Sequence, residues 1–209
     1  MKRRWSIGVV LFADFELLDV FGPLEMYGAA PEQFEICMVA QTDGPVPSRQ
    51  GPKAIADYAF PEKRQYDMLL VPGGMGTRKE VDNPALLNWL RQHAAGAQYV
   101  TAVCTGSALL ARAGLLDGVR ATTNKKSFGW ATSQGPKVNW VRQARWVEDG
   151  RFFTSSGVSA GMDMALAVIA KLLGPETADT IATWTEYEWH RDAGWDPFAA
   201  VHGLVRGDS

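Results

Sequence analysis

The sequence contains few cysteines and few histidines. Of 209 residues, two are cysteine, Cys37 and Cys104, and three are histidine. Two cysteines in unrelated contexts do not form a disulfide framework, and their presence fits a reducing cytoplasm. The histidines, at positions 93, 190 and 202, do not have the spacing of a metal site. We therefore expect a cytoplasmic protein with no metal ion or other cofactor.

The sequence also lacks an excess of charge and a long apolar run. It has 21 Lys and Arg against 23 Asp and Glu, a net charge of −2. This balance provides no general field for nucleic acid or for an anionic membrane. The basic residues 2–4 precede a short apolar run that ends at Asp14 without a small-residue cleavage site, so we expect a first strand and not a signal peptide. We expect a small-molecule substrate, no nucleic acid partner and no membrane partner.

Strand-like and helix-like segments alternate along the chain. Strands are predicted at 6–11, 34–40, 67–71, 98–103 and 121–123, and helices at 15–27, 84–95, 105–112, 127–132, 158–173 and 177–188. Pro23 should start a second helical segment within 15–27. Hairpins are predicted at 44–56 and around Asp149-Gly150. Repeated β-α units predict an α/β three-layer sandwich with a mostly parallel central sheet, whose ligands bind at the carboxyl ends of the strands.

Cys104 stands where a run of strand-forming residues ends and a short helix begins. Such a strand–turn–helix is typical of a nucleophile elbow, which holds its side chain at the crest of a sheet. The N–H groups and partial positive charge of the helix N-terminus favour a thiolate, the nucleophilic form. The alternative is a small buried hydrophobe, which is our interpretation of Cys37 inside the strand 34–40.

A second strand end carries the sequence Val-Pro-Gly-Gly-Met-Gly at 71–76. The adjacent glycines Gly73 and Gly74 leave backbone N–H groups exposed, which can form an oxyanion hole or an anion nest. A Gly-Gly pair can also be a simple turn. Both strand ends should meet at one edge of the sheet, where Cys104 and these donors would form a site.

Four motifs in this order carry a resemblance to a known family. They are Leu-Leu-Asp-Val-Phe-Gly-Pro at 17–23, Val-Pro-Gly-Gly at 71–74, Val-Cys-Thr-Gly at 103–106 and Gly-Val-Ser-Ala-Gly-Met-Asp at 157–163. Over roughly residues 6–173 the chain resembles the ThiJ/PfpI superfamily, which has the class I glutamine-amidotransferase-like, flavodoxin-like fold. Within it, Asp19 and the Cys104-Thr105 pair are most similar to the isocyanide hydratases. The resemblance implies a homodimer.

The resemblance also implies roles for individual residues. Cys104 would be the nucleophile and Asp19 its acidic partner, hydrogen-bonded to the sulfur and shuttling protons. Thr105 would supply a hydroxyl or backbone contact beside the sulfur, and Gly73 and Gly74 the donor pocket. A carboxyl held against a developing thiolate is driven towards its protonated form and can then donate a proton. Without the resemblance, Asp19 would be interpreted as an exposed or helix-capping aspartate.

The sequence departs from some relatives after Thr122-Thr123. Peptidases and glyoxalases of the superfamily tend to place a histidine there, and this chain has Asn124, followed by Lys125 and Lys126. One alternative is that these lysines reach the site, but the commoner role of such a pair, and our interpretation, is solvated surface. We expect a lyase that hydrates isocyanides to N-substituted formamides through a thioimidate. The alternatives are a cofactor-free glyoxalase or deglycase, and a non-catalytic redox- or ligand-sensing domain. We do not expect the helix-turn-helix module of a transcription regulator, for which the 209 residues would leave no room.

The last part of the chain is rich in tryptophan. We expect one domain over 1–209, with an aromatic C-terminal extension from about 175. The aromatic segments 184–190 and 195–198 would pack on the domain or complete a neighbour's site in a dimer, and packing is the commoner role of such residues.

Overall fold

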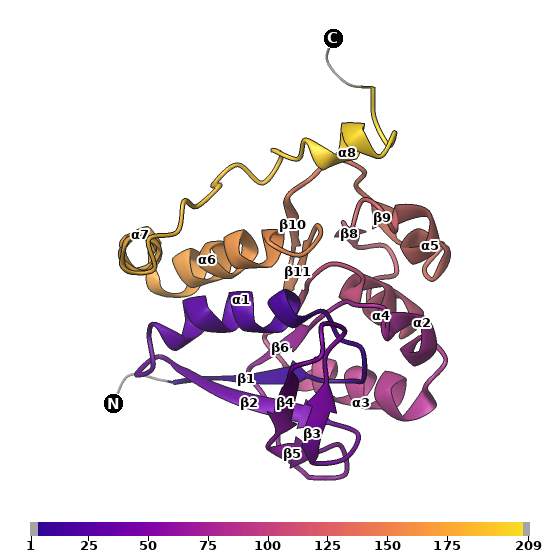
Figure 1. Cartoon of the computed structure of the whole chain (residues 1–209), viewed down its shortest axis with the longest axis vertical. Helices are drawn as coiled ribbons and strands as arrows, with labels where there is room; N and C mark the ends of the chain where they lie inside the picture. The colour runs from indigo at the N-terminus through magenta and orange to yellow at the C-terminus, as the bar shows by residue number, and fades with distance from the viewer. Residues whose placement is uncertain (1–3, 207–209) are drawn as a thin grey trace.

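A twisted sheet runs through the part of the chain that this computed structural model describes, residues 4–206 (Figure 1). Its strands are β1 (Trp5–Val10), β2 (Phe34–Ala40), β5 (Tyr58–Ala59), β6 (Met68–Val71), β7 (Tyr99–Ala102), β10 (Trp146–Asp149) and β11 (Phe152–Ser155). The strand order is β10-β11-β7-β6-β1-β2-β5, and all neighbours are parallel except β10 and β11. This order confirms the predicted parallel sheet and the predicted hairpin at Asp149-Gly150.

Helices cover both faces of the sheet, which gives the predicted three-layer sandwich (Figure 1). Helices α1 and α6 pack together on one face, and α3 and α4 lie on the other. The helices are α1 (Leu17–Gly28), α2 (Thr77–Glu80), α3 (Pro84–Gly96), α4 (Gly106–Arg112), α5 (Phe128–Ser133), α6 (Ala160–Leu173), α7 (Pro175–Trp184) and α8 (Phe198–Val201). None of the helices described here combines the length and the apolar character needed to span a membrane.

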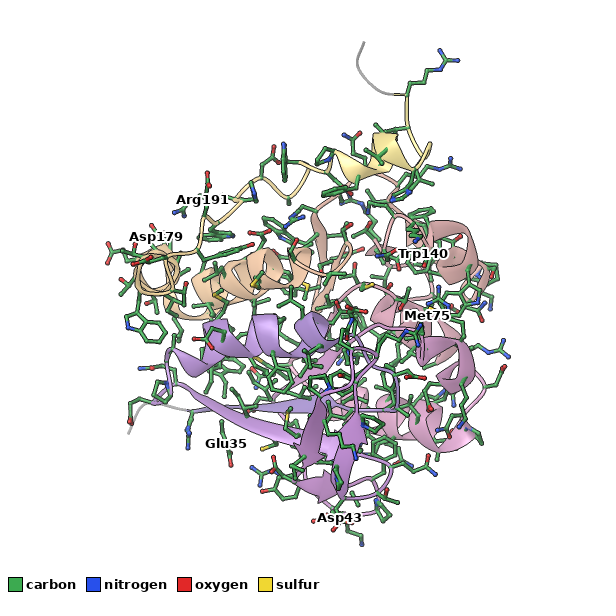
Figure 2. All side chains as sticks on the ribbon, viewed as in Figure 1. Glu35, Asp43, Met75, Trp140, Asp179 and Arg191 are labelled. Atoms are coloured by element: carbon green, nitrogen blue, oxygen red, sulfur yellow. The ribbon has the colours of Figure 1, made fainter. Side chains whose placement is uncertain are left out.

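Two small ribbons flank the main sheet. Strands β3 (Gly44–Pro47) and β4 (Lys53–Ala56) pair antiparallel and confirm the hairpin predicted at 44–56. Strands β8 (Arg120–Ala121) and β9 (Asn139–Trp140) pair parallel. After α7 the chain returns over the molecule, and the ion pair between Arg191 and Asp179, 2.6 Å apart, joins it to α7 (Figure 2).

The core lies between the helices and the central strands. All four residues of β6 are buried, as a strand covered on both faces requires. Cys37 is buried in the middle of β2, as predicted, and burial raises its pKa to about 11. This cysteine therefore has a packing role.

The predicted break at Pro23 is wrong, because α1 continues through this residue. Proline removes one N–H donor from the helix, which usually ends or kinks it. Here α1 lies so close to α6 that a Cβ at Gly161 would come within 3.2 Å of Pro23, and a Cβ at Gly22 within 2.9 Å of Met162. The close packing of the two helices keeps α1 continuous.

Candidate active site

Cys104 lies between β7 and α4, where the chain turns sharply at the carboxyl edge of the sheet. Its φ of +57° is a left-handed conformation that costs a non-glycine residue about 1–3 kcal/mol. The Cys104 N–H donates to Ser156 O at 3.1 Å, and its carbonyl accepts from the hydroxyls of Ser107 and Thr123, both at 3.0 Å. The strand–turn–helix geometry predicted for Cys104 is therefore present.

The residue that begins α4 must be a glycine. A Cβ at Gly106 would lie 2.2 Å from Val71 O and 2.8 Å from Pro72 O. The turn after β6 thus presses directly on the N-terminus of α4, which brings the two predicted strand ends together.

Asp19 reaches the same point from the first turn of α1. Its carboxyl is fully buried, and Oδ2 accepts a hydrogen bond from the Gly73 N–H at 2.8 Å. The other oxygen, Oδ1, is buried without a hydrogen-bond partner within residues 4–206. The carboxyl also lies beside the Cys104 thiol, which lowers its pKa. The alternative of an exposed or capping aspartate is wrong.

Burial has the largest effect on the pKa values of the Asp19 carboxyl and the Cys104 thiol. It raises the pKa of the Asp19 carboxyl well above the usual value, and the charge of Glu16 adds to this. Burial also raises the pKa of the Cys104 thiol, and the negative charge of Asp19 raises it further. The backbone N–H groups of Thr105 and Val158, which hydrogen-bond the sulfur, lower it. The expectation that the helix N-terminus makes Cys104 a thiolate is therefore wrong on balance, because burial and Asp19 raise the pKa of the thiol more than the Thr105 and Val158 N–H groups lower it.

Thr105, the residue after the cysteine, positions the glycine turn. Its buried hydroxyl accepts from the Gly74 N–H at 3.1 Å and lies 3.1 Å from the Thr77 hydroxyl oxygen. Since the Gly73 N–H is bonded to Asp19, both glycine N–H groups have protein partners. In this structure the turn therefore positions Asp19 and Thr105, and does not present the free donor pocket that we predicted at Gly73 and Gly74.

Gly73 lies where the site residues converge. A Cβ on it would come within 2.6 Å of the Thr105 nitrogen, 2.7 Å of the Thr105 hydroxyl oxygen and 2.9 Å of Asp19 Oδ2. The absence of a side chain at this position is what allows α1 and the elbow to meet.

Val158 is a residue that the sequence did not single out. Its φ of +42° is unusual for a β-branched residue. In this conformation its backbone N–H donates a hydrogen bond to the Cys104 sulfur. Strained backbone of this kind clusters at functional sites. The Gly-Val pair at 157–158 indicates a tight turn, but it does not reveal a donor to sulfur.

The three residues after Thr122-Thr123 differ in their burial and in their contacts. Asn124 Oδ1 accepts from the Ser127 N–H at 2.9 Å, and its amide packs against Gly157. Lys126 is exposed, as expected. Lys125 is buried, which corrects its interpretation as solvated surface, because its ammonium group lies 3.1 Å from Asp196 Oδ2 and donates to Thr122 and Thr123.

Arg78 contributes a positive charge that the sequence analysis missed. Its guanidinium lies 3.9 Å from the centre of the Trp130 ring and donates to Ser127 at 2.8 Å and Thr77 at 3.1 Å. Burial lowers the pKa of Arg78, and a negative charge on Cys104 opposes that shift. Its place directly after the Gly-Gly-Met-Gly-Thr turn is the sequence feature that could have revealed it.

Two cavities adjoin the elbow and share Leu18 and Val158. The first, the α8 cavity, has a volume of about 330 Å³ and is lined by Leu18, Asn124, Lys125, Lys126, Ser156, Gly157, Val158, Ser159, Phe198 and His202. The second, the α1 cavity, has a volume of about 350 Å³ and is lined by Glu16, Leu17, Leu18, Phe21, Gln50 and Val158. Both lie next to the residues that hold the Cys104 sulfur.

Comparison with known proteins gives one family and several relatives. The profile of the DJ-1/PfpI family matches residues 5–171. The chain is 36% identical over 184 residues to the isonitrile hydratase of Pseudomonas putida, covering 87% of this chain and 78% of that protein. It is 35% identical over 135 residues to the HTH-type transcriptional regulator CdhR of Pseudomonas aeruginosa, covering 65% of this chain but 40% of the regulator.

Among solved structures, the chain is similar to a ThiJ/PfpI family protein from Pseudomonas syringae. The TM-score is 0.83 with 29% sequence identity, over 90% of this chain and 77% of that one. Drosophila melanogaster DJ-1beta has the same fold, with a TM-score of 0.79 and 19% identity over 90% of this chain and the whole of that chain.

Proposed function

The chain belongs to the DJ-1/PfpI family, and from this premise we propose that it is a cysteine-dependent hydratase that converts isocyanides to N-substituted formamides. The observation that carries the proposal is the buried contact between the Asp19 carboxyl and the Cys104 thiol. The similarity to an isonitrile hydratase over most of both chains supports it. The carboxyl, and not a histidine, is the proton-transfer group beside this sulfur.

In the first step the Cys104 sulfur attacks the terminal carbon of the isocyanide. At this point the Asp19–Cys104 pair holds one proton, on the Asp19 carboxyl, and the sulfur attacks as the thiolate. The O–H bond of Asp19 breaks and its proton moves to that carbon, so that one S–C bond and one C–H bond form and the N≡C group becomes the C=N group of a thioimidate. Asp19 delivers this proton, because its carboxyl touches the thiol and Oδ1 has no protein partner among the described residues. The raised pKa of Asp19 suits a general acid at neutral pH.

In the second step water adds to the carbon of the thioimidate. Asp19, now ionised, takes a proton from this water and passes it to the imine nitrogen, so that a C–O bond forms, an O–H bond of water breaks and Asp19 is ionised again. The C–S bond of the tetrahedral intermediate then breaks, which releases the formamide and returns the sulfur and one proton to the Asp19–Cys104 pair. The N–H groups of Thr105 and Val158 stabilise the sulfur as it leaves, because they hydrogen-bond it directly.

The site gives less support to the alternative functions. A non-catalytic sensor needs no proton donor beside its cysteine, whereas the Asp19 carboxyl is buried beside the Cys104 thiol. A glyoxalase-type mechanism that uses a Cys-His pair lacks its histidine at Asn124. The hydratase is therefore the function that we propose.

The test is a turnover assay with the purified protein. Wild type and Cys104→Ala are incubated with alkyl and aryl isocyanides, and formamide is measured by liquid chromatography and mass spectrometry, with methylglyoxal as the competing substrate class. We expect formamide from wild type only, because the variant cannot form the covalent intermediate. Turnover of methylglyoxal without turnover of any isocyanide would contradict the proposal.

A further inference from the structure

The C-terminal segment (residues 185–206) forms part of the wall of the α8 cavity. It lies beyond residues 5–171, which match the family profile. In Figure 1 it leaves α7, runs above α6 in an extended path and forms α8 above β10. From this segment, Phe198 and His202 line the cavity together with Leu18 and Val158.

A buried ion pair anchors the first part of this segment. Asp163 Oδ2 lies 2.7 Å from the guanidinium of Arg145, and both side chains are buried. The other carboxylate oxygen of Asp163 accepts from the Tyr187 hydroxyl and from the His190 N–H, each at 3.0 Å. The path of the segment over α6 is therefore held by groups of the α/β core.

A second buried ion pair, between Lys125 and Asp196, lies next to the α8 cavity, which Lys125 lines. Asp196 Oδ2 lies 3.1 Å from the Lys125 ammonium, and the exposures of the two side chains are 0% and 2%. Asp196 Oδ1 accepts the Phe198 N–H at 3.1 Å, which fixes the start of α8. Lys125 also donates to the carbonyl of Thr123, whose hydroxyl bonds the Cys104 carbonyl. A continuous set of contacts thus joins the elbow to Phe198.

We propose that the α8 cavity is the subsite for the N-substituent of the isocyanide, and that Phe198 selects substrates with an aromatic or branched apolar substituent. This inference rests on the proposed hydratase function. Val158 donates its N–H to the Cys104 sulfur and lines this cavity. Ser156, whose carbonyl accepts from the Cys104 N–H, lines this cavity and is absent from the lining of the α1 cavity, so the α8 cavity is the one that adjoins the elbow on two sides.

The character of the cavity supports an apolar occupant. Leu18, Val158 and Phe198 present apolar side chains to it, and an aromatic ring on Phe198 adds to the contact. A cavity of about 150 Å³ is enough for benzene, and this one has about 330 Å³. An aryl or branched alkyl group therefore fits.

The test compares Phe198→Ala with Val201→Ala, a change in the same short helix at a residue that does not line the cavity. Phe198 is 48% exposed and Val201 is 72% exposed, so neither belongs to the core and both variants should fold. The measured quantity is the ratio of kcat/KM for benzyl isocyanide to that for ethyl isocyanide. We expect Phe198→Ala to lower this ratio about tenfold, the scale of one lost aromatic contact, and Val201→Ala to leave it unchanged.

A second measurement separates failure of the subsite from failure of the proposed function. The rates at which N-benzyl iodoacetamide and iodoacetamide alkylate Cys104 are compared by peptide mass spectrometry, which needs no hydratase activity. A benzyl preference that Phe198→Ala removes supports the subsite, even if no isocyanide is turned over. Unchanged ratios in Phe198→Ala overturn it, and a shift in Phe21→Ala instead would place the substituent in the α1 cavity.

Discussion

At the scale of single residues, a carboxyl and a thiol that are buried in contact titrate as one unit. Asp19 and Cys104 meet this condition, since each lies in the other's field and both have raised pKa values. Two such acids cannot both ionise readily, so the pair keeps at least one proton near neutral pH. The site can therefore carry nucleophile and acid together without a histidine.

The raised pKa of Asp19 makes stability depend on pH. The ordinary pKa of this carboxyl is 3.8. As the pH rises above that value, Asp19 loses its proton in the unfolded chain but keeps it in the folded protein, where the carboxyl is buried. The contribution of Asp19 to stability is thus present at low pH and is lost as pH rises towards its folded pKa. Relative to Asp19→Asn, wild type should lose up to about 1.4 kcal/mol per pH unit across this range.

Urea unfolding of both proteins between pH 4 and pH 7 measures this difference. Glu16→Gln, which removes a partly exposed carboxyl whose charge adds to the Asp19 shift, should keep most of the pH dependence because burial is the larger cause. A constant difference between wild type and Asp19→Asn over the range would show that the carboxyl ionises normally in the folded protein.

Sequence patterns located the main residues of the site but not their hydrogen bonds. The strand-to-helix pattern pointed to Cys104, and the family resemblance implied that Asp19 and Thr105 lie beside it; the structure places the three together. The same patterns could not show that the Gly73 and Gly74 N–H groups have protein partners, because those contacts depend on three-dimensional packing. Lys125 was misread for a related reason: its partner, Asp196, lies far along the chain.

At the scale of elements, local periodicity predicted most strands and helices, and α1 shows where it fails. Proline chemistry alone predicts a break at Pro23, but the close contact of α1 with α6 overrides it. Local sequence patterns also could not predict the path of the C-terminal segment. Its position depends on two buried ion pairs that only the folded chain brings together.

The Lys125–Asp196 pair gives a prediction for this element. Lys125→Met and Asp196→Asn each leave one buried charge without its partner and should each lower the free energy of unfolding by about 3 kcal/mol or more. The double variant removes both charges, and the amide that replaces the Asp196 carboxylate still offers an oxygen to the Phe198 N–H. The double variant should therefore lose clearly less free energy of unfolding than the two single variants added together. Urea unfolding of the four proteins measures this coupling, and additive losses would show that the pair does not position the segment.

At the scale of the whole molecule, we propose a homodimer. The outer surface includes large apolar side chains on α1 and at the end of α7, with Leu18 39%, Phe21 43% and Trp184 68% exposed. Apolar side chains gathered on a helix face are commonly covered by a second copy. Multi-angle light scattering at micromolar concentration should give about twice the chain mass of 22.9 kDa. A mass of one chain at that concentration would contradict the dimer.

The central claim is that the Asp19–Cys104 pair performs the hydration, and the most direct test is the turnover of a simple isocyanide by matched carboxyl variants. Asp19→Asn should remain folded by circular dichroism and lose about a hundredfold or more in kcat, the usual scale of general acid–base catalysis. Glu16→Gln, whose carboxylate acts on the pair only through its charge, should lose far less. Equal activity of Asp19→Asn and wild type would contradict the account.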